Sequence, residues 1–456
     1  RITQQDDTTY VAEYIYADDD QWRMGRTMTI YRGPLPAAAR QMARLSLFDW
    51  ITVSVAGANQ PLAGMIRDFV GADGGTPTAT IVGSDVRLPA RAAALANGTI
   101  SHALDYDDTH FAYIGHPSVA IYPAALAAAE DVGASGTDLV DAFLVGAEAA
   151  CRIGMVLGRD HYDAGFHQTA TSGAFGATVA ASRLYGLDAA ALRAALGLVS
   201  SRASGLKSQF GTMGKPFNAG AAAANGIEAA GLARRGFTAA DDAFDGPQSF
   251  LVSHHARPDG AVLINDLDST QFVFADVRHK LHACCHGTHA MIEALLLLRA
   301  MPACHRDQIA QIRVHTAPRW LNVCDIKTPR TGLEIKFSYV FLAAMVMRGV
   351  NLAAYESYDD RACDDPALQA LAARVEIIGD DTIADSGTRV EIVCDDNTHL
   401  EQSFDLLAPL DPDQLGQRLL AKSAALLGDE RAADLWAAIT NLDHLSAADI
   451  ARQLRR

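Results

Sequence analysis

The sequence predicts a mainly α-helical protein that has a large all-helical domain and a smaller α+β domain. Three observations support this prediction. Between residues 34 and 250, apolar residues recur every three or four positions, as they do in amphipathic helices. After residue 276, apolar and polar residues alternate in short segments that are typical of strands. Helical segments lie between these strands, which indicates an α+β arrangement.

These patterns divide the 456 residues into four parts. We expect an all-helical domain over 31–275, an α+β domain over 276–408, and C-terminal helices over 409–456 that return to the helical domain. Residues 1–30 are expected to form a separate N-terminal arm, to which we assign no function. This polar, acidic segment lacks the apolar core of a secretory signal.

The helical domain is predicted from an amphipathic helix near residues 39–57 and from three later helix boundaries. One apolar face contains Met42, Leu45, Phe48, Ile51 and Val55. At each later boundary a glycine ends one helix and a side chain with an oxygen is expected to cap the next. The three expected caps are Thr137, Asp188 and Thr238.

The α+β domain is read from three strand segments. Ile312, Val314 and Thr316 alternate with polar residues, and Val390 and Ile392 do the same before the turn-like sequence Asp-Asp-Asn. The third strand is expected within 373–380. Helices are expected within 286–301 and 337–350.

Charge and composition exclude several classes of partner. The chain has 38 Lys and Arg and 54 Asp and Glu, a formal charge of −16, which disfavours nucleic acid and anionic membrane as partners. No apolar run is long enough to cross a bilayer. The seven cysteines include no CxxC pair, which favours a reducing compartment and predicts a cytoplasmic protein.

One segment of the helical domain, 102–123, is unusually rich in titratable groups. It contains three aspartates and three histidines, whereas the sequence on either side is mostly Ala, Leu and Gly. The titratable residues are His102, Asp105, Asp107, Asp108, His110 and His116. A metal site, a solvated loop and an acid/base site are the three interpretations.

Metal sites are weighed first, and we predict that there is none. His282 and His286 have the i, i+4 spacing of helical zinc ligands, but no HExxH motif accompanies them. The aspartates at 105–108 resemble helical magnesium motifs, but they lack a further aspartate at helical spacing. A zinc hydrolase at the His282 segment therefore remains only an alternative.

Phosphate and nucleophile motifs are weighed next. The sequence around Lys215 fails as a P-loop because Gln209 and Pro216 stand where glycine and Ser or Thr are required. Lys215 is either a surface lysine or a cation at a helix N-terminus, where a carboxylate would bind. A single histidine such as His167 is more often structural. No GxSxG motif is present, and no GxGxxG motif follows an expected strand.

Taken in order, the motifs resemble the MmgE/PrpD family, which includes 2-methylcitrate dehydratase, cis-aconitate decarboxylase and iminodisuccinate epimerase. The motifs are "HALDYDDTHFAYIGHPS", "GFHQTATSGAFGA", "FGTMGKPFNAGAAAANGIEAA", "HKLHACCHGTHA" and "EIKFSYVFLAAMV". The resemblance covers 34–456. It implies that the α+β domain is a lid, that the protein is a homodimer, and that no metal or organic cofactor is required.

The resemblance also implies site residues, position by position. Asp105, His116, His167 and Lys215 match catalytic positions of the family. Thr109, Lys280 and Tyr339 match substrate-binding positions, the last two on the lid side. The implied substrate is a small di- or tricarboxylate, held by the two lysines. A histidine would serve as acid or base, because imidazole titrates near neutral pH.

We therefore predict an enzyme that abstracts a proton beside a carboxylate. Dehydration is placed ahead of epimerisation and decarboxylation. The alternative from another class is a non-enzymatic helical binding or scaffold protein, which predicts exposed apolar patches and a filled pocket. The enzyme predicts an open cationic pocket that contains Asp105, His167 and Lys215.

Overall fold

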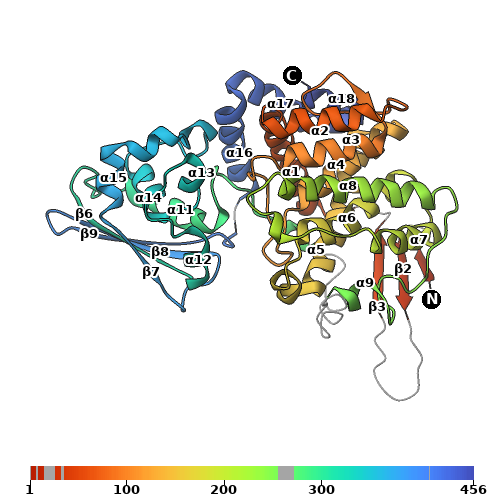
Figure 1. The fold of residues 1–456 in the computed structure, drawn as a ribbon, viewed down its shortest axis with the longest axis horizontal. Coiled ribbons are helices and arrows are strands. Elements are labelled where there is room, and N and C mark those ends of the chain that lie inside the picture. The colour runs from red at the N-terminus through yellow and green to blue at the C-terminus, as the bar shows by residue number, and fades with distance from the viewer. Residues whose placement is uncertain are drawn as a thin grey trace, which may run out of the picture. The chain divides into compact units, whose positions relative to one another are not determined.

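The computed structural model describes residues 35–254, 272–409 and 411–455, together with the backbone of three short strands before residue 35. The chain forms two compact units, residues 1–279 with 430–456 and residues 280–429. The first unit is mostly helical and the second mixes helices with a four-stranded sheet, as the sequence predicts (Figure 1).

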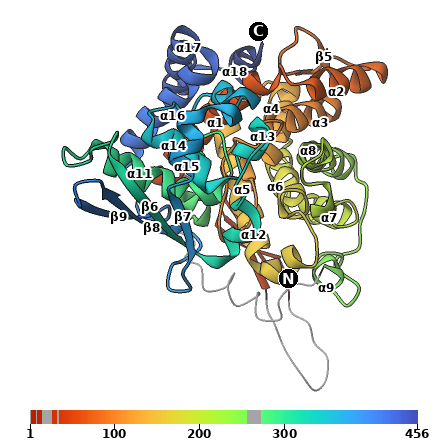
Figure 2. The ribbon, with the colours of Figure 1, turned by 60° about the vertical axis from the view of Figure 1, so that its left-hand side comes forward.

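The first unit is built around helix α6 (Gln168–Leu184), which packs against α4 (Pro117–Val132), α5 (Gly136–Asp163) and α8 (Gly214–Ala233). Figures 1 and 2 both show α6 beside α5 and α8. Every residue of α6 from 168 to 182 is buried, because Ala and Gly let the neighbouring helices approach closely. The other described elements of this unit are α1 (Ala37–Gly57), α2 (Pro61–Ala72), α3 (Ala90–Ser101), α7 (Ala189–Ser200), α9 (Phe250–Ser253), α17 (Asp429–Thr440), α18 (Ala447–Ala451), β4 (Ala79–Thr80) and β5 (Arg87–Leu88).

The helix boundaries confirm one of the three expected caps and correct two. The Asp188 carboxylate accepts a hydrogen bond from the Ala191 amide and caps α7. Thr137 is not a cap, because Ser135 caps α5 in a capping box with Asp138. Thr238 is followed by turns rather than by a helix. The glycine before each expected cap does have positive φ, at Gly133, Gly186 and Gly236.

The second unit contains a sheet with strand order β7-β6-β8-β9. Strand β6 (Ile309–Thr316) pairs parallel with β7 (Val375–Gly379) and antiparallel with β8 (Gly387–Cys394), which forms a hairpin with β9 (His399–Asp405). Alternate residues of β8 are buried, and α11 (His289–Ala300) packs on β8 and β9. The expected strands and both expected helices are confirmed, the second helix as α14 (Tyr339–Met347). Short helices α12 (Leu321–Cys324), α13 (Gly332–Ile335) and α15 (Pro366–Ala372) and the longer α16 (Pro412–Leu427) complete the unit.

The predicted arm, 1–30, is described only in part. Strands β1 (Ile2–Asp6), β2 (Thr9–Tyr14) and β3 (Arg26–Tyr31) form an antiparallel sheet in the order β1-β2-β3, and the rest of 1–34 lies outside the described residues. Among the helices of the described chain, none is both long and apolar enough to span a membrane.

Candidate active site

Three long helices begin at the same place in the first unit. His116 is the N-cap residue of α4, His167 is the N-cap residue of α6, and Lys215 lies in the first turn of α8. The loop 102–116, which joins α3 to α4, adds its aspartates to this cluster. Each helix N-terminus carries a partial positive charge, so the three together favour a bound anion.

Asp105 and Lys215 form an ion pair in this cluster. The Lys215 Nζ lies 2.6 Å from Asp105 Oδ2, and the Lys215 side chain is 14% exposed. Lys215 is therefore a largely buried cation at a helix N-terminus rather than a surface lysine. Asp105 adopts positive φ (50°), a conformation that an aspartate tolerates better than most residues. This backbone conformation belongs to the tight loop that carries Asp105 into the cluster.

Asp107 lies between two imidazoles. His102 Nδ1 donates a hydrogen bond to Asp107 Oδ1 at 2.8 Å, and His116 Nδ1 lies 2.8 Å from Asp107 Oδ2. His116 Nε2 lies 3.7 Å from Asp105 Oδ1. Burial by itself would raise the pKa of Asp107, but the two histidines outweigh it and hold that pKa well below its usual value. Asp107 is therefore an anion that stabilises positive charge on His116.

His167 lies beside the same group of side chains. Its ring stacks on that of His102 with 6.2 Å between centroids and meets the Phe210 ring edge-on at 5.0 Å. Burial lowers the pKa of His167 well below its usual value, and the charge of Lys215 lowers it further. His167 is thus a neutral imidazole at pH 7.

The three residues expected to bind substrate have different surroundings. Thr109 exchanges two backbone hydrogen bonds with Arg278, of 2.8 and 2.7 Å, which anchor the aspartate loop to the segment around residue 278. Lys280 and Tyr339 belong to the second unit, and both are buried. The Tyr339 hydroxyl donates to the Gly287 carbonyl at 2.7 Å, so its hydrogen already has a protein acceptor.

The same loop is also where a metal ion would fit best. Donor atoms of His102, Asp105, Asp107 and His116 all lie within 4.8 Å of one another, and no other such group occurs among the described residues. However, the 2.8 Å contact between His102 and Asp107 is a hydrogen bond, and Lys215 already supplies a cation to Asp105. In the second unit, His282 of the zinc alternative instead contacts Glu293 at 2.8 Å.

Comparison with known proteins decides the family. The MmgE/PrpD N-terminal domain matches residues 28–259, and the MmgE/PrpD C-terminal domain matches residues 282–426. This chain belongs to the MmgE/PrpD family. The two matched domains divide the chain at nearly the same place as the two structural units, whose boundary along the sequence lies between residues 279 and 280.

Three similar proteins are named as a cis-aconitate decarboxylase or as resembling one. The chain is 24% identical to the cis-aconitate decarboxylase-like protein oryM of Aspergillus oryzae, over 92% of this chain and 93% of that protein. It is 25% identical to the cis-aconitate decarboxylase of Aspergillus terreus, over 90% of each chain. The human cis-aconitate decarboxylase is 38% identical over 158 residues, which is 33% of this chain.

Three residues of this cluster were not predicted as site residues from the sequence. His102 and Asp107 were noted as part of a titratable segment, but only their contacts distinguish them from Asp108 and His110, which face other partners. Asn218 contacts His167 and follows Lys215 by three residues, a spacing that places both on one face of α8. That spacing was the available signal for Asn218.

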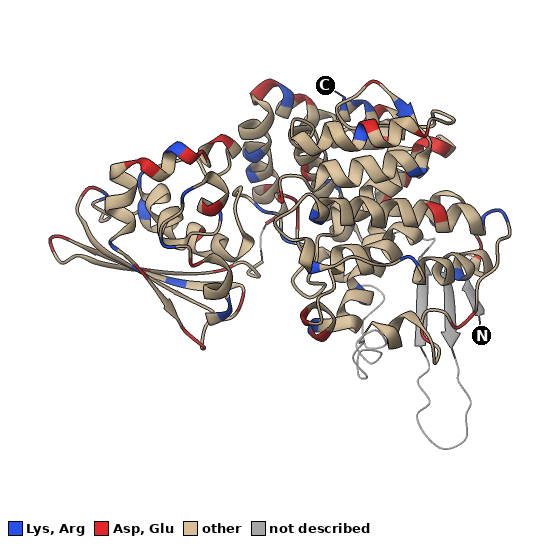
Figure 3. Ribbon diagram, viewed as in Figure 1, with Lys and Arg blue, Asp and Glu red and all other residues tan. Residues whose placement is uncertain are grey.

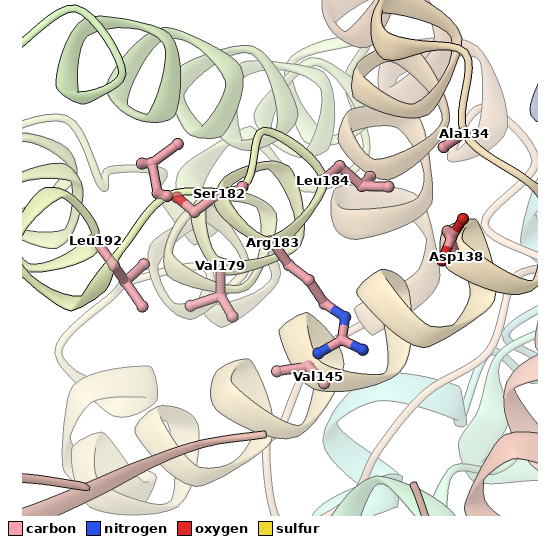
Figure 4. A pocket seen from close by; sticks show the side chains of 10 residues that line it. Ala134, Asp138, Val145, Val179, Ser182, Arg183, Leu184 and Leu192 are labelled. Atoms are coloured by element: carbon pink, nitrogen blue, oxygen red, sulfur yellow. The ribbon is translucent and has the colours of Figure 1, made fainter. Parts of the chain in front are cut away.

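A cavity of the first unit is separate from this cluster. A cavity of about 330 Å³ lies among α5, α6 and α7, and none of the seven predicted site residues lines it. Figure 4 shows Val145, Val179 and Leu192 along its wall, with Arg183 directed toward Val145. Lys and Arg are interspersed with Asp and Glu along the helices of both units (Figure 3).

Asp108 holds the start of α4 and gives a prediction of pH dependence. Its carboxylate accepts hydrogen bonds from the Ser118 amide (3.2 Å) and hydroxyl (2.6 Å). Burial raises the pKa of Asp108 to about 7, and the negative charges of Asp49 and Asp107 contribute to the increase. The pKa of an unfolded aspartate is about 4. The folded protein therefore holds an extra proton between pH 4 and 7, and its stability falls as pH rises through that window.

Asp108→Asn is expected to remove this loss, because the amide cannot ionise and still pairs with Ser118. At pH 8 the variant should be more stable than the parent by about 1–3 kcal/mol, and at pH 4 the two should be similar. Thermal unfolding at pH 4, 6 and 8 measures the difference. Asp107→Asn is the comparison variant. Because the pKa of Asp107 is lowered in the folded protein, this substitution should destabilise the protein, and the loss of stability should be largest at pH 8. An equal effect of Asp108→Asn at every pH would contradict the account.

Proposed function

We propose that this MmgE/PrpD protein is a cofactor-independent dehydratase that removes a proton beside a carboxylate of a small hydroxylated di- or tricarboxylate. The observation that carries the proposal is the contrast between two histidines beside one buried lysine. His116 lies between Asp107 and Asp105, whereas His167 is buried next to the cation Lys215. One imidazole is thus suited to take a proton and the other to remain neutral.

Carboxylate recognition rests on Lys215 and the three helix N-termini. A substrate carboxylate beside Lys215 Nζ would share the ammonium with Asp105 and lie where the dipoles of α4, α6 and α8 are most positive. When the carbon beside that carboxylate loses its proton, negative charge spreads onto the carboxylate oxygens. Lys215 and the neutral His167 are placed to stabilise that charge.

Proton transfer is assigned to His116. Its imidazole removes the proton from carbon and becomes an imidazolium, which the anionic Asp107 stabilises. The bond between the neighbouring carbon and its hydroxyl then breaks, a carbon–carbon double bond forms, and the leaving hydroxide takes the proton from His116 as water. His116 returns to its starting state, and no other reactant is consumed.

Decarboxylation is the second candidate, and the named relatives favour it, since they are cis-aconitate decarboxylases or resemble one over nearly the full chain. In that reaction a carbon–carbon bond breaks, carbon dioxide leaves, and the remaining carbanion takes one proton. Such a reaction requires a proton donor rather than a base. Asp107 would stabilise a protonated His116 in either reaction, as the product of proton removal or as that donor, and dehydration is placed first on the resemblance to the family alone.

Proton NMR in D₂O with 2-methylcitrate, citrate, cis-aconitate and iminodisuccinate tests the proposal. A dehydratase would form an alkene from a hydroxy acid, with deuterium exchange at the carbon beside the carboxylate. Loss of carbon dioxide from cis-aconitate would select decarboxylation, and inversion of iminodisuccinate would select epimerisation. A folded protein that neither converts nor exchanges any of the four acids would contradict the proposal and favour the binding-protein alternative.

A further inference from the structure

Asn218, in the second turn of α8, contacts two groups that together fix the direction of its amide. Its Nδ2 atom lies 3.4 Å from the Leu206 carbonyl oxygen and 3.2 Å from His167 Nδ1. A carbonyl oxygen only accepts hydrogen bonds, so the amide atom that faces it is the nitrogen. The same nitrogen then donates to His167 Nδ1, which must accept and therefore carries no proton.

The protonation of His167 follows from this contact. A neutral imidazole with no proton on Nδ1 carries its proton on Nε2. No other side chain of the described residues hydrogen-bonds to either ring nitrogen of His167. Asn218 thus decides which nitrogen is the donor.

The local backbone makes the contact possible. The His167 amide donates to the Gly205 carbonyl at 2.9 Å, which joins the start of α6 to the loop before α8. Gly205 has φ of 151°, and a Cβ atom there would come within 2.6 Å of the Ala170 side chain and 3.3 Å of Asn218 Cγ. Glycine therefore lets this loop pass close enough for Asn218 to reach the His167 ring.

We propose that Asn218 is a positioning residue that holds His167 as the Nε2-protonated tautomer, so that His167 presents a hydrogen-bond donor to the substrate. This inference rests on the proposed function for its catalytic consequence, but the tautomer itself is a property of the free protein. It gives the two histidines different roles, because His167 donates whereas His116 accepts a proton. The burial and neighbouring cation that keep His167 neutral support this assignment.

The substitution Asn218→Asp tests the inference, since it changes a donor into an acceptor with almost no change in shape. In this variant a carboxylate faces Nδ1 and accepts a hydrogen bond from it, so the single proton of a neutral ring lies on Nδ1. Nε2 then has no hydrogen to donate. We expect kcat to fall by about 10²-fold with KM changed less than threefold. Asn225→Asp, on the same helix and in contact with Arg202, is the matched control and should keep kcat within threefold.

Long-range ¹H–¹⁵N spectra of histidine-labelled protein supply a readout that needs no substrate, with His167 assigned by its loss in His167→Gln. The parent and Asn225→Asp should show an unprotonated Nδ1 at His167, and Asn218→Asp a protonated one. A protonated Nδ1 in the parent would overturn the inference, as would full activity in Asn218→Asp after the tautomer has switched. An unprotonated Nδ1 in a parent protein that converts no acid would support the tautomer and reject the proposed function.

Discussion

Lys215→Met is expected to lower kcat/KM by about 10³-fold, because the variant loses both a carboxylate-binding charge and the charge that stabilises the deprotonated substrate. Methionine has nearly the length of lysine, so the first turn of α8 should keep its packing. The effect should divide between a higher KM and a lower kcat, since the ammonium contacts the substrate before and during proton removal. Steady-state kinetics on the acid identified by NMR measure both parameters.

Two controls separate this role from a structural one. Lys207→Met removes a lysine eight positions earlier, whose ammonium binds the Tyr162 carbonyl at 2.8 Å, and should keep kcat/KM within fivefold. The double variant Asp105→Asn with Lys215→Met removes both members of the ion pair. If Lys215 served only to neutralise Asp105, the double variant would recover activity. We expect no recovery, and recovery to a tenth of the parent rate would reject the substrate-binding role.

Substitution of His116 is expected to have the second large effect, a loss of about 10²–10⁴-fold in kcat, which is the usual contribution of a general base. His116→Asn keeps an amide near the position of Nδ1, beside Asp107, and lacks any atom at Nε2. His116→Gln keeps an amide near the position of Nε2 that does not titrate. Both variants should lose the activity, because the proposed mechanism needs a group at Nε2 that takes a proton.

The rate of deuterium exchange at the substrate carbon separates proton abstraction from later steps. Both His116 variants should lose exchange together with turnover, while thermal unfolding shows that the fold remains. Activity above a tenth of the parent value in His116→Gln would mean that a hydrogen bond at Nε2 is sufficient. In that case another residue would be the base, and Asp105, 3.7 Å from Nε2, would be the next to replace.

Much of the architecture follows from local patterns in the sequence. The alternation of Ile312, Val314 and Thr316 predicts β6, and Asp188 is read correctly as the cap of α7, since both signals depend on residues close together in the chain. Thr137 is a case in which the local sequence pattern predicted the wrong cap. Ser135 and Thr137 are equally suitable as caps, and the capping box that Ser135 forms with Asp138 decides between them.

The residues of the candidate site were found in the sequence only through their resemblance to a family. Asp105, His116, His167 and Lys215 are separated by up to 110 residues, and no spacing rule relates positions so far apart. Three helix N-termini and the loop 102–116 bring them together, and the packing of α4, α6 and α8 produces that convergence. Ion pairs such as that of Lys215 with Asp105 therefore required the folded structure.

The sequence by itself determined the fold class, most of the helices and strands, the family and the residue types available for chemistry. These depend on periodicity, capping and short motifs, which are local. Only the tertiary structure decided that Asp107 serves two histidines, that His167 is buried beside a cation, and that Asn218 reaches its ring. The physical reason is that burial, charge and hydrogen-bond direction arise from neighbours in space, and those properties determine which nitrogen holds a proton.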